Sequence, residues 1–168
     1  SVTMLSGEAK VFGATLKVGE RFVIREGKRT PFEVVKKSTF DLVLGENASF
    51  EEIEGSTIPS SWEKVSEELI LRGKLLSVMV LGDVDSGKTS FCTYLANKAL
   101  EKKLKVAVID ADLGQSDVGP PATIGFSHIT APVKDLFEVE AESAFFIGLT
   151  SPSRVIENII EKLSFLKS

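Results

Sequence analysis

The chain has 168 residues and a formal net charge of −4 at pH 7, with 43% hydrophobic and 26% charged residues. These values are ordinary for a globular protein, and the acidic balance excludes broad attraction to nucleic acid, which would need a local basic groove. No apolar run approaches the about 18 residues that predict a transmembrane helix, so we expect a cytoplasmic protein with no membrane partner.

The N-terminal part of the chain is typical of a small β domain. Short segments rich in Val, Ile and Phe alternate with turns marked by glycines and Pro31. These segments are residues 9–12, 21–24, 32–35 and 40–44. Regular short strands with such turns predict an antiparallel β-sandwich or barrel, which we assign to residues 1–60.

A bridging helix is expected over residues 61–74. Ser60 and Glu63 have the spacing of a capping box, in which two side chains accept hydrogen bonds from backbone amides of the first turn. Apolar residues then recur at helical spacing until Gly73, a residue typical of helix ends.

From residue 75 onward the pattern changes to alternating strands and helices. Residues 75–81, 105–109 and 144–147 are apolar enough to form buried strands. An amphipathic helix follows the first of them, and a last helix is expected to begin at Pro152. This order predicts an α/β fold with a parallel sheet flanked by helices over residues 75–168.

The sequence Gly-Asp-Val-Asp-Ser-Gly-Lys-Thr at residues 82–89 has the spacing G-x-x-x-x-G-K-[ST] of a P-loop. In such a loop the backbone N–H groups surround phosphates, the lysine reaches the β- and γ-phosphates, and the hydroxyl meets Mg²⁺. We therefore expect ATP and Mg²⁺ as cofactors, with Lys88 as a catalytic residue and Thr89 as a metal ligand. The residues expected to bind the nucleotide are Gly82, Asp85, Ser86, Gly87, Lys88, Thr89 and Ser90.

Asp110 and Asp112 follow the strand expected at residues 105–109. The carboxyl end of a parallel strand is also where the P-loop would lie. A carboxylate there can hold the water shell of Mg²⁺ or take the proton of an attacking hydroxyl, and the residues alone do not decide which aspartate does which. Gln115 is close enough in sequence to orient a water molecule or the substrate.

Other polar residues make weaker candidates. Ser116 and Asp117 follow the acidic pair, and His128 is interpreted as a strand-face or surface residue rather than a general base. Cys92, the single cysteine, lies on the inward side of the helix after the P-loop and is interpreted as a structural thiol.

The sequence Asp-Ala-Asp-Leu-Gly-Gln at residues 110–115 resembles the D-x-D-x-G-Q segment of the polynucleotide 5′-hydroxyl kinase family, which acts in RNA processing. Three more segments resemble that family: the start of its N-terminal β domain, its P-loop, and the Thr/Ser-Pro segment that clasps the substrate. In this chain they are residues 7–13, 82–89 and 148–152. The resemblance therefore covers both parts of the chain in order.

The resemblance implies an ATP-dependent kinase that transfers the γ-phosphate to 5′-hydroxyl ends of RNA or DNA, and it allows protein partners in RNA processing. It implies that Asp112 is the base that activates the hydroxyl and that Gln115 supports it. Asp110 would lie near the water molecules of the metal, and Thr150 and Ser151 would face the substrate phosphate.

The family pattern continues with an arginine-bearing lid and a tryptophan-containing segment after the clasp. Neither occurs before the last residue given, Ser168. We therefore expect an incomplete kinase part, in which transfer of phosphate is slow or absent.

Two other functions stay open on the sequence. One is a nucleotide-dependent switch of the partitioning or metal-insertion type, whose second motif resembles residues 108–112. Asp83 counts against it, because that class usually carries a lysine early in the loop. The other is an ATP-binding scaffold for a protein partner, which would bind ATP without transferring phosphate.

Overall fold

The computed structural model describes residues 1–73, 75–151 and 155–167. It divides into two compact units, Ser1–Met79 and Val80–Ser168, each with its own strands and helices. None of the helices in these described ranges combines the length and apolarity that crossing a membrane requires.

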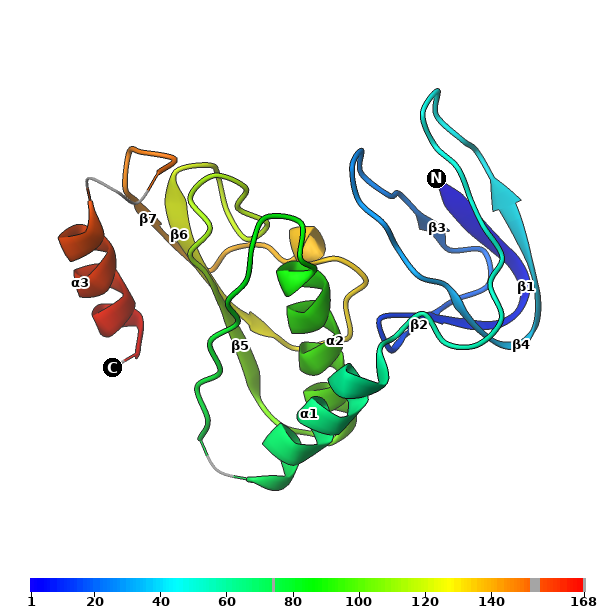
Figure 1. Ribbon diagram of the computed structural model, residues 1–168, viewed down its shortest axis with the longest axis horizontal. Helices are drawn as coiled ribbons and strands as arrows, with labels where there is room; N and C mark the ends of the chain where they lie inside the picture. Colours follow the sequence, from blue (N-terminus) through cyan, green and yellow to red (C-terminus); the bar gives the residue numbers. More distant parts are fainter. Residues whose placement is uncertain (74, 152–154, 168) are drawn as a thin grey trace. The chain divides into compact units, whose positions relative to one another are not determined.

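The first unit contains one antiparallel sheet, drawn in blue to cyan in Figure 1. Its strands are β1 (Val2–Val11), β2 (Ala14–Leu16), β3 (Arg21–Phe22) and β4 (Glu33–Leu42). Strand β1 pairs with the other three, each time antiparallel, which confirms the predicted strand direction. The segments expected at residues 32–35 and 40–44 fall largely within one long strand, β4, which pairs with β1 along its length with three register shifts.

Alternating side chains of β1 and its neighbours form the core of this sheet. Met4, Val11 and Leu16 are almost completely buried. Beside them, the Phe32 ring meets the rings of Phe22 and Phe40 edge on, with centroids 6.3 and 5.8 Å away. Among the strands described here, all four belong to a single sheet, so the predicted sandwich or barrel is not seen in them.

The expected bridging helix is present as α1 (Ser60–Leu71). The residue that caps its N-terminus is Pro59, and no side chain caps the helix, so the predicted capping box of Ser60 and Glu63 is wrong. Ser60 is already the first helical residue, one position too late to act as the cap. The helix ends just before Gly73, whose φ of 61° lies in the left-handed region.

The second unit combines a three-stranded sheet with two long helices. Its elements are α2 (Lys88–Glu101), β5 (Val106–Asp110), β6 (Thr123–Ile129), the short 3-10 helix η1 (Leu136–Glu138), β7 (Ser143–Phe146) and α3 (Ile156–Lys167). Strand β6 is central, between β5 and β7. The unit is therefore of the α/β class, and its two long helices follow the predicted pattern, although the predicted helix start at Pro152 lies outside the described residues.

The prediction of a parallel sheet is wrong for these strands, because β6 runs antiparallel to both β5 and β7. The sequence prediction overlooked β6, which lies between β5 and β7 and runs opposite to both. Residues 75–81, expected as a buried strand, form no strand, and Leu75, Met79 and Leu81 are largely exposed. No described strand pairs with the backbone groups of that segment, so the apolar run alone does not make it a strand.

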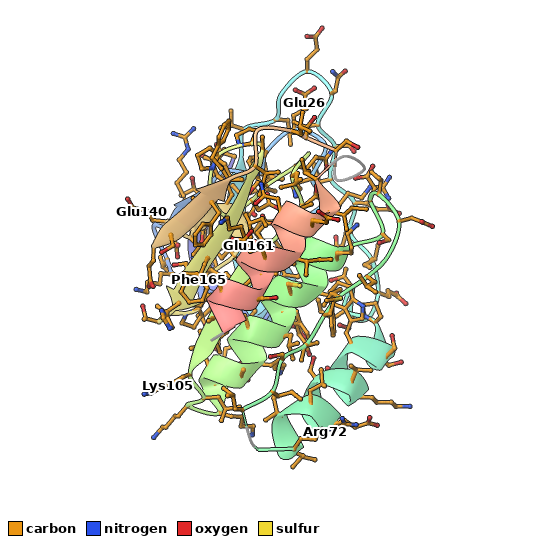
Figure 2. The ribbon with its side chains drawn as sticks, turned by 90° about the vertical axis from the view of Figure 1, so that its left-hand side faces the viewer. Glu26, Arg72, Lys105, Glu140, Glu161 and Phe165 are labelled. Atoms are coloured by element: carbon orange, nitrogen blue, oxygen red, sulfur yellow. The ribbon has the colours of Figure 1, made fainter. Side chains whose placement is uncertain are left out.

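The two helices of the second unit cover different faces of its sheet (Figure 1). Ala96 of α2 packs in one apolar cluster with Ile129, and Ile159 of α3 packs in another with Ile124. Side chains alternate along a strand, so positions 124 and 129 of β6 point to opposite faces. In Figure 2, α3 carries the labelled Phe165, whose ring meets the ring of Phe145 edge on at 5.7 Å.

Candidate functional site

The P-loop leads directly into the first turn of α2. Gly87 precedes this helix with φ 86° and ψ 18°, a left-handed conformation that glycine adopts at little cost. Because the capping residue has no side chain, the first N–H groups of α2 are left for a ligand, and helix N-termini favour anions. Lys88 is half-buried and its Nζ donates a hydrogen bond to the carbonyl oxygen of Asp83, 2.8 Å away. The amino group therefore folds back over the loop that would surround a phosphate.

The loop itself is tightly curved. A side chain at Gly82 would place its Cβ 2.6 Å from Ser86 Oγ. Asp85 has φ 57°, which is uncommon for a residue other than glycine. These positions agree with a loop whose backbone, rather than its side chains, would approach a ligand closely.

The carboxylate of Asp110, the last residue of β5, receives hydrogen bonds from the loop that follows it. Oδ1 accepts from the amide of Asp112 at 3.0 Å. Oδ2 accepts from the amides of Asp117 at 2.6 Å and Val118 at 3.0 Å. The hydroxyl of Ser116 donates to the same oxygen at 3.3 Å. Residues 111–118 are thus folded around one half-buried side chain.

Asp112 has a different environment. Its side chain is exposed, and Oδ1 accepts hydrogen bonds from the amides of Gly114 and Gln115, both at 3.1 Å. Within the residues that the structure describes, Oδ2 of Asp112 receives none of the hydrogen bonds found. One oxygen orients the carboxylate, and the other is available for a ligand or a proton.

The sequence analysis did not identify Gly125 of β6, which makes room for the loop that carries Asp112. A Cβ at this position would overlap the carbonyl oxygen of Val118 and lie 2.7 Å from its carbonyl carbon. The backbone of the Asp112 loop therefore lies directly on β6. A glycine inside an alternating strand pattern is the sequence signal that could have revealed this close approach.

Cys92 connects the P-loop helix to the acidic strand end. It packs against the same apolar cluster as Val106 and Val108 of β5. Burial raises the pKa of its thiol, and the negative charge of Asp110 raises it further. Cys92 lies one turn after Lys88 on the same helix. The first part of α2 and the end of β5 are therefore neighbours.

Thr150 and Ser151 lie beyond β7 and are exposed. A Cβ at Gly114 would be 3.5 Å from the carbonyl oxygen of Thr150 and 3.6 Å from Oδ1 of Asp112. The structure thus brings Thr150 next to the loop that carries Asp112 and Gln115. Pro152, the end of the predicted clasp, lies outside the described residues.

His128 is away from this group. It lies on β6 opposite Ala107, near the start of β5, whereas Asp110 at the other end of β5 faces Gly125. Its exposed ring is 2.8 Å from Oε2 of Glu142, and this hydrogen bond lowers the pKa of the Glu142 carboxyl. This arrangement agrees with the interpretation of His128 as a strand-face residue.

The oxygen atoms near the P-loop suit a hard divalent cation such as Mg²⁺. Thr89 lies in the first turn of α2, and Asp112 has the oxygen Oδ2 that is not engaged by the loop. Hydroxyl and carboxylate oxygens are ligands that Mg²⁺ accepts, usually together with water and phosphate. Asp110 fits this role less well, because both of its oxygens already accept hydrogen bonds.

Comparison with known proteins gives a family match over the second unit. The family described as mRNA cleavage and polyadenylation factor CLP1 P-loop matches residues 82–167. A polyribonucleotide 5′-hydroxyl-kinase of Thermococcus kodakarensis is 38% identical over 99 residues, which are 59% of this chain and 28% of the relative. One from Methanocaldococcus jannaschii is 39% identical over 87 residues, 52% of this chain and 24% of the relative.

A further relative extends the similarity across both units. Polyribonucleotide 5′-hydroxyl-kinase Clp1 of Danio rerio is 29% identical over 173 aligned residues, which cover 92% of this chain and 37% of the relative. The chain thus spans between 24% and 37% of the length of these three proteins.

Proposed function

Because the chain belongs to the family of the mRNA cleavage and polyadenylation factor CLP1 P-loop, we propose that it takes part in ATP-dependent phosphorylation of the 5′-hydroxyl ends of RNA or DNA. The observation that carries this proposal is the P-loop helix α2 beside the strand end that carries Asp110 and Asp112. Thr150 lies against the same loop.

On the nucleotide side, the P-loop residues would hold ATP. The backbone of residues 82–87 and the first amides of α2 would surround the phosphates, and Lys88 would leave the Asp83 carbonyl to neutralise the γ-phosphate. Bound Mg²⁺ would supply further neutralisation of phosphate charge. The Thr89 hydroxyl is the group best suited to hold it, with water molecules and the phosphates as the other ligands.

On the acceptor side, Asp112 would act as the general base. It would take the proton as the 5′-oxygen forms a bond to the γ-phosphorus, while the bond from phosphorus to the β,γ-bridging oxygen breaks and ADP leaves with the electron pair. The amides of Gly114 and Gln115 hold the carboxylate in place through its other oxygen. Thr150 and Ser151, exposed beside this loop, would contact the substrate phosphate.

We also propose the division of the chain into a β domain at residues 1–60, a bridging helix at 61–74 and a kinase part at 75–168. The names of the relatives, polyribonucleotide 5′-hydroxyl-kinases, support an RNA acceptor in preference to DNA. Protein partners in RNA processing and a cytoplasmic location stay predictions from the resemblance and the composition.

The test is phosphate transfer from γ-labelled ATP to oligonucleotides that begin with a 5′-hydroxyl. Two proteins are compared: this chain, and the chain extended at its C-terminus to the length of the relatives. Label on the oligonucleotide with the extended protein supports the kinase. Free labelled phosphate alone supports a nucleotide switch, bound ATP with neither product supports a scaffold, and both results contradict the proposal.

Lys88→Ala in the extended protein should lower the transfer rate at least a hundredfold, since one preorganised charge contact to a transition state is worth about that factor. The fold should persist, because the described contact of Lys88 Nζ is a single hydrogen bond to the backbone. Lys105→Ala is the matched control, since it removes the same kind of side chain from an exposed position just before β5, where Figure 2 labels Lys105. Equal transfer by folded Lys88→Ala and Lys105→Ala proteins would refute the assignment of Lys88.

A further inference from the structure

We infer that Asp110 is a positioning residue, whose carboxylate holds the loop that carries Asp112 and Gln115 instead of binding the metal or its water shell. The inference rests on the proposed function only for the catalytic role of the loop. The hydrogen bonds between Asp110 and the loop are present without any ligand. Its first readout therefore requires no enzymatic activity.

The Asp110 carboxylate is engaged by the backbone of its own loop through both oxygens. An ionised carboxylate offers about four acceptor sites on its two oxygens. Three loop amides donate to it, Asp112 to Oδ1 and both Asp117 and Val118 to Oδ2. The Ser116 hydroxyl lies 3.3 Å from Oδ2 and equally far from the Val118 carbonyl oxygen, so its one hydrogen serves either acceptor. The two amide bonds to Oδ2 leave that oxygen no acceptor site for a metal-bound water molecule, and a water molecule on Oδ1 would share it with the Asp112 amide.

Asp110 and Gly125 together hold one peptide group. They face each other in the register of β5 and β6, so their side-chain positions lie on the same face of the sheet. The backbone of Val118 lies where Gly125 has no side chain, and its amide donates to Asp110 Oδ2. The far end of the loop is thus fixed to the sheet from two sides.

The near end of the loop is fixed by the same carboxylate. Oδ1 of Asp110 accepts from the amide of Asp112, and Asp112 in turn accepts from the amides of Gly114 and Gln115. Bonds from N–H groups to an ionised carboxylate are about twice as strong as those between neutral groups. Loss of the Asp110 carboxylate should therefore release both ends of the loop and leave Asp112 poorly oriented.

The direct test is amide hydrogen exchange of the 168-residue chain. In Asp110→Ala, the amides of Asp117 and Val118 should exchange at least tenfold faster than in the wild-type chain. Asp110→Asn has the same size and keeps one acceptor oxygen, so it should give an intermediate rate. Asp112→Asn is the matched control, because its side chain accepts from other amides and should leave these two unchanged.

Circular dichroism identifies the variants that keep the fold. If Asp110→Ala does not fold, the exchange rates of the Asp117 and Val118 amides in Asp110→Asn test the inference instead. Wild-type exchange of the Asp117 and Val118 amides in a folded Asp110 variant would overturn the inference.

A second readout separates positioning from metal binding in the extended protein. Asp110→Asn should lower kcat by about tenfold while the Mg²⁺ concentration that gives half the maximal rate stays unchanged. A rise of several fold in that concentration would assign Asp110 to the metal and overturn the inference. If the extended wild-type protein transfers no phosphate, the proposed function fails, and the exchange experiment still decides the role of Asp110.

Discussion

Among single residues, the candidate site contains two kinds of side chain. Asp112 and Thr150 are exposed and could touch a substrate, whereas Asp110 is half-buried and bonded to the backbone around it. The motif identified both aspartates but not their difference. That difference depends on which amides the loop turns toward each carboxylate, and a motif does not contain this information.

Cys92 offers a pH-dependent test of the packing between α2 and β5. Burial and the nearby Asp110 raise the pKa of its thiol, so the neutral form should persist in the folded protein as the pH rises past the ordinary value of about 8.5. The thiolate is the reactive form, so modification by a thiol-disulfide reagent should begin at a higher pH in the native chain than in denaturant. The rate of modification against pH measures this, and the signal comes from one group because the chain has one cysteine.

The sign of the linked stability effect follows from the same shift. The unfolded chain loses the thiol proton first, so the contribution of Cys92 to stability is complete below the unfolded pKa and falls as the pH rises through the folded pKa. Equal midpoints of modification in the native and unfolded chains would contradict the buried environment of Cys92.

At the scale of elements, β6 determines the second unit. It is the central strand, it contributes Ile124 and Ile129 to two different cores, and it supports the Asp112 loop at Gly125. The sequence prediction overlooked this strand and assigned a parallel sheet. Strand direction depends on which segments become neighbours, and the apolar pattern of one segment does not specify its neighbour.

Gly125→Ala should destabilise the second unit by about 3 kcal/mol, because the added methyl group overlaps the backbone of Val118 and an overpacked core can relax only partly. Thermal unfolding followed by circular dichroism measures the loss. Gly114→Ala is the matched control, since its Cβ would meet neighbours only at 3.5 Å or more. An equal melting temperature for the two variants would show that the loop does not lie on β6.

For the whole molecule, the segment at residues 75–81 is the most informative. It lies at the junction of the two units, has no regular secondary structure, and exposes Leu75, Met79 and Leu81. Exposed irregular backbone is where proteases cut first. The apolar composition that predicted a buried strand thus occurs here in an accessible stretch.

Limited digestion with thermolysin, which cuts before large apolar residues such as Leu, Val, Met and Phe, should therefore cleave first within residues 75–81. The expected products are two resistant fragments that correspond to the two units, identified by mass spectrometry. Phe50 provides an internal comparison, because it is also exposed in an irregular segment. An earlier cut at Phe50 than at residues 75–81 would contradict this prediction.

The sequence by itself determined the local features. The P-loop at residues 82–89 and the helix after it depend on spacing and periodicity within short windows. Only the tertiary structure decided what depends on residues far apart in the chain: the antiparallel β6, the contact of Val118 with Gly125, and the neighbouring positions of Thr150 and Gly114. Local patterns determine which apolar faces and backbone polar groups must be buried or hydrogen-bonded. Which distant segment packs against them is decided only when the chain folds.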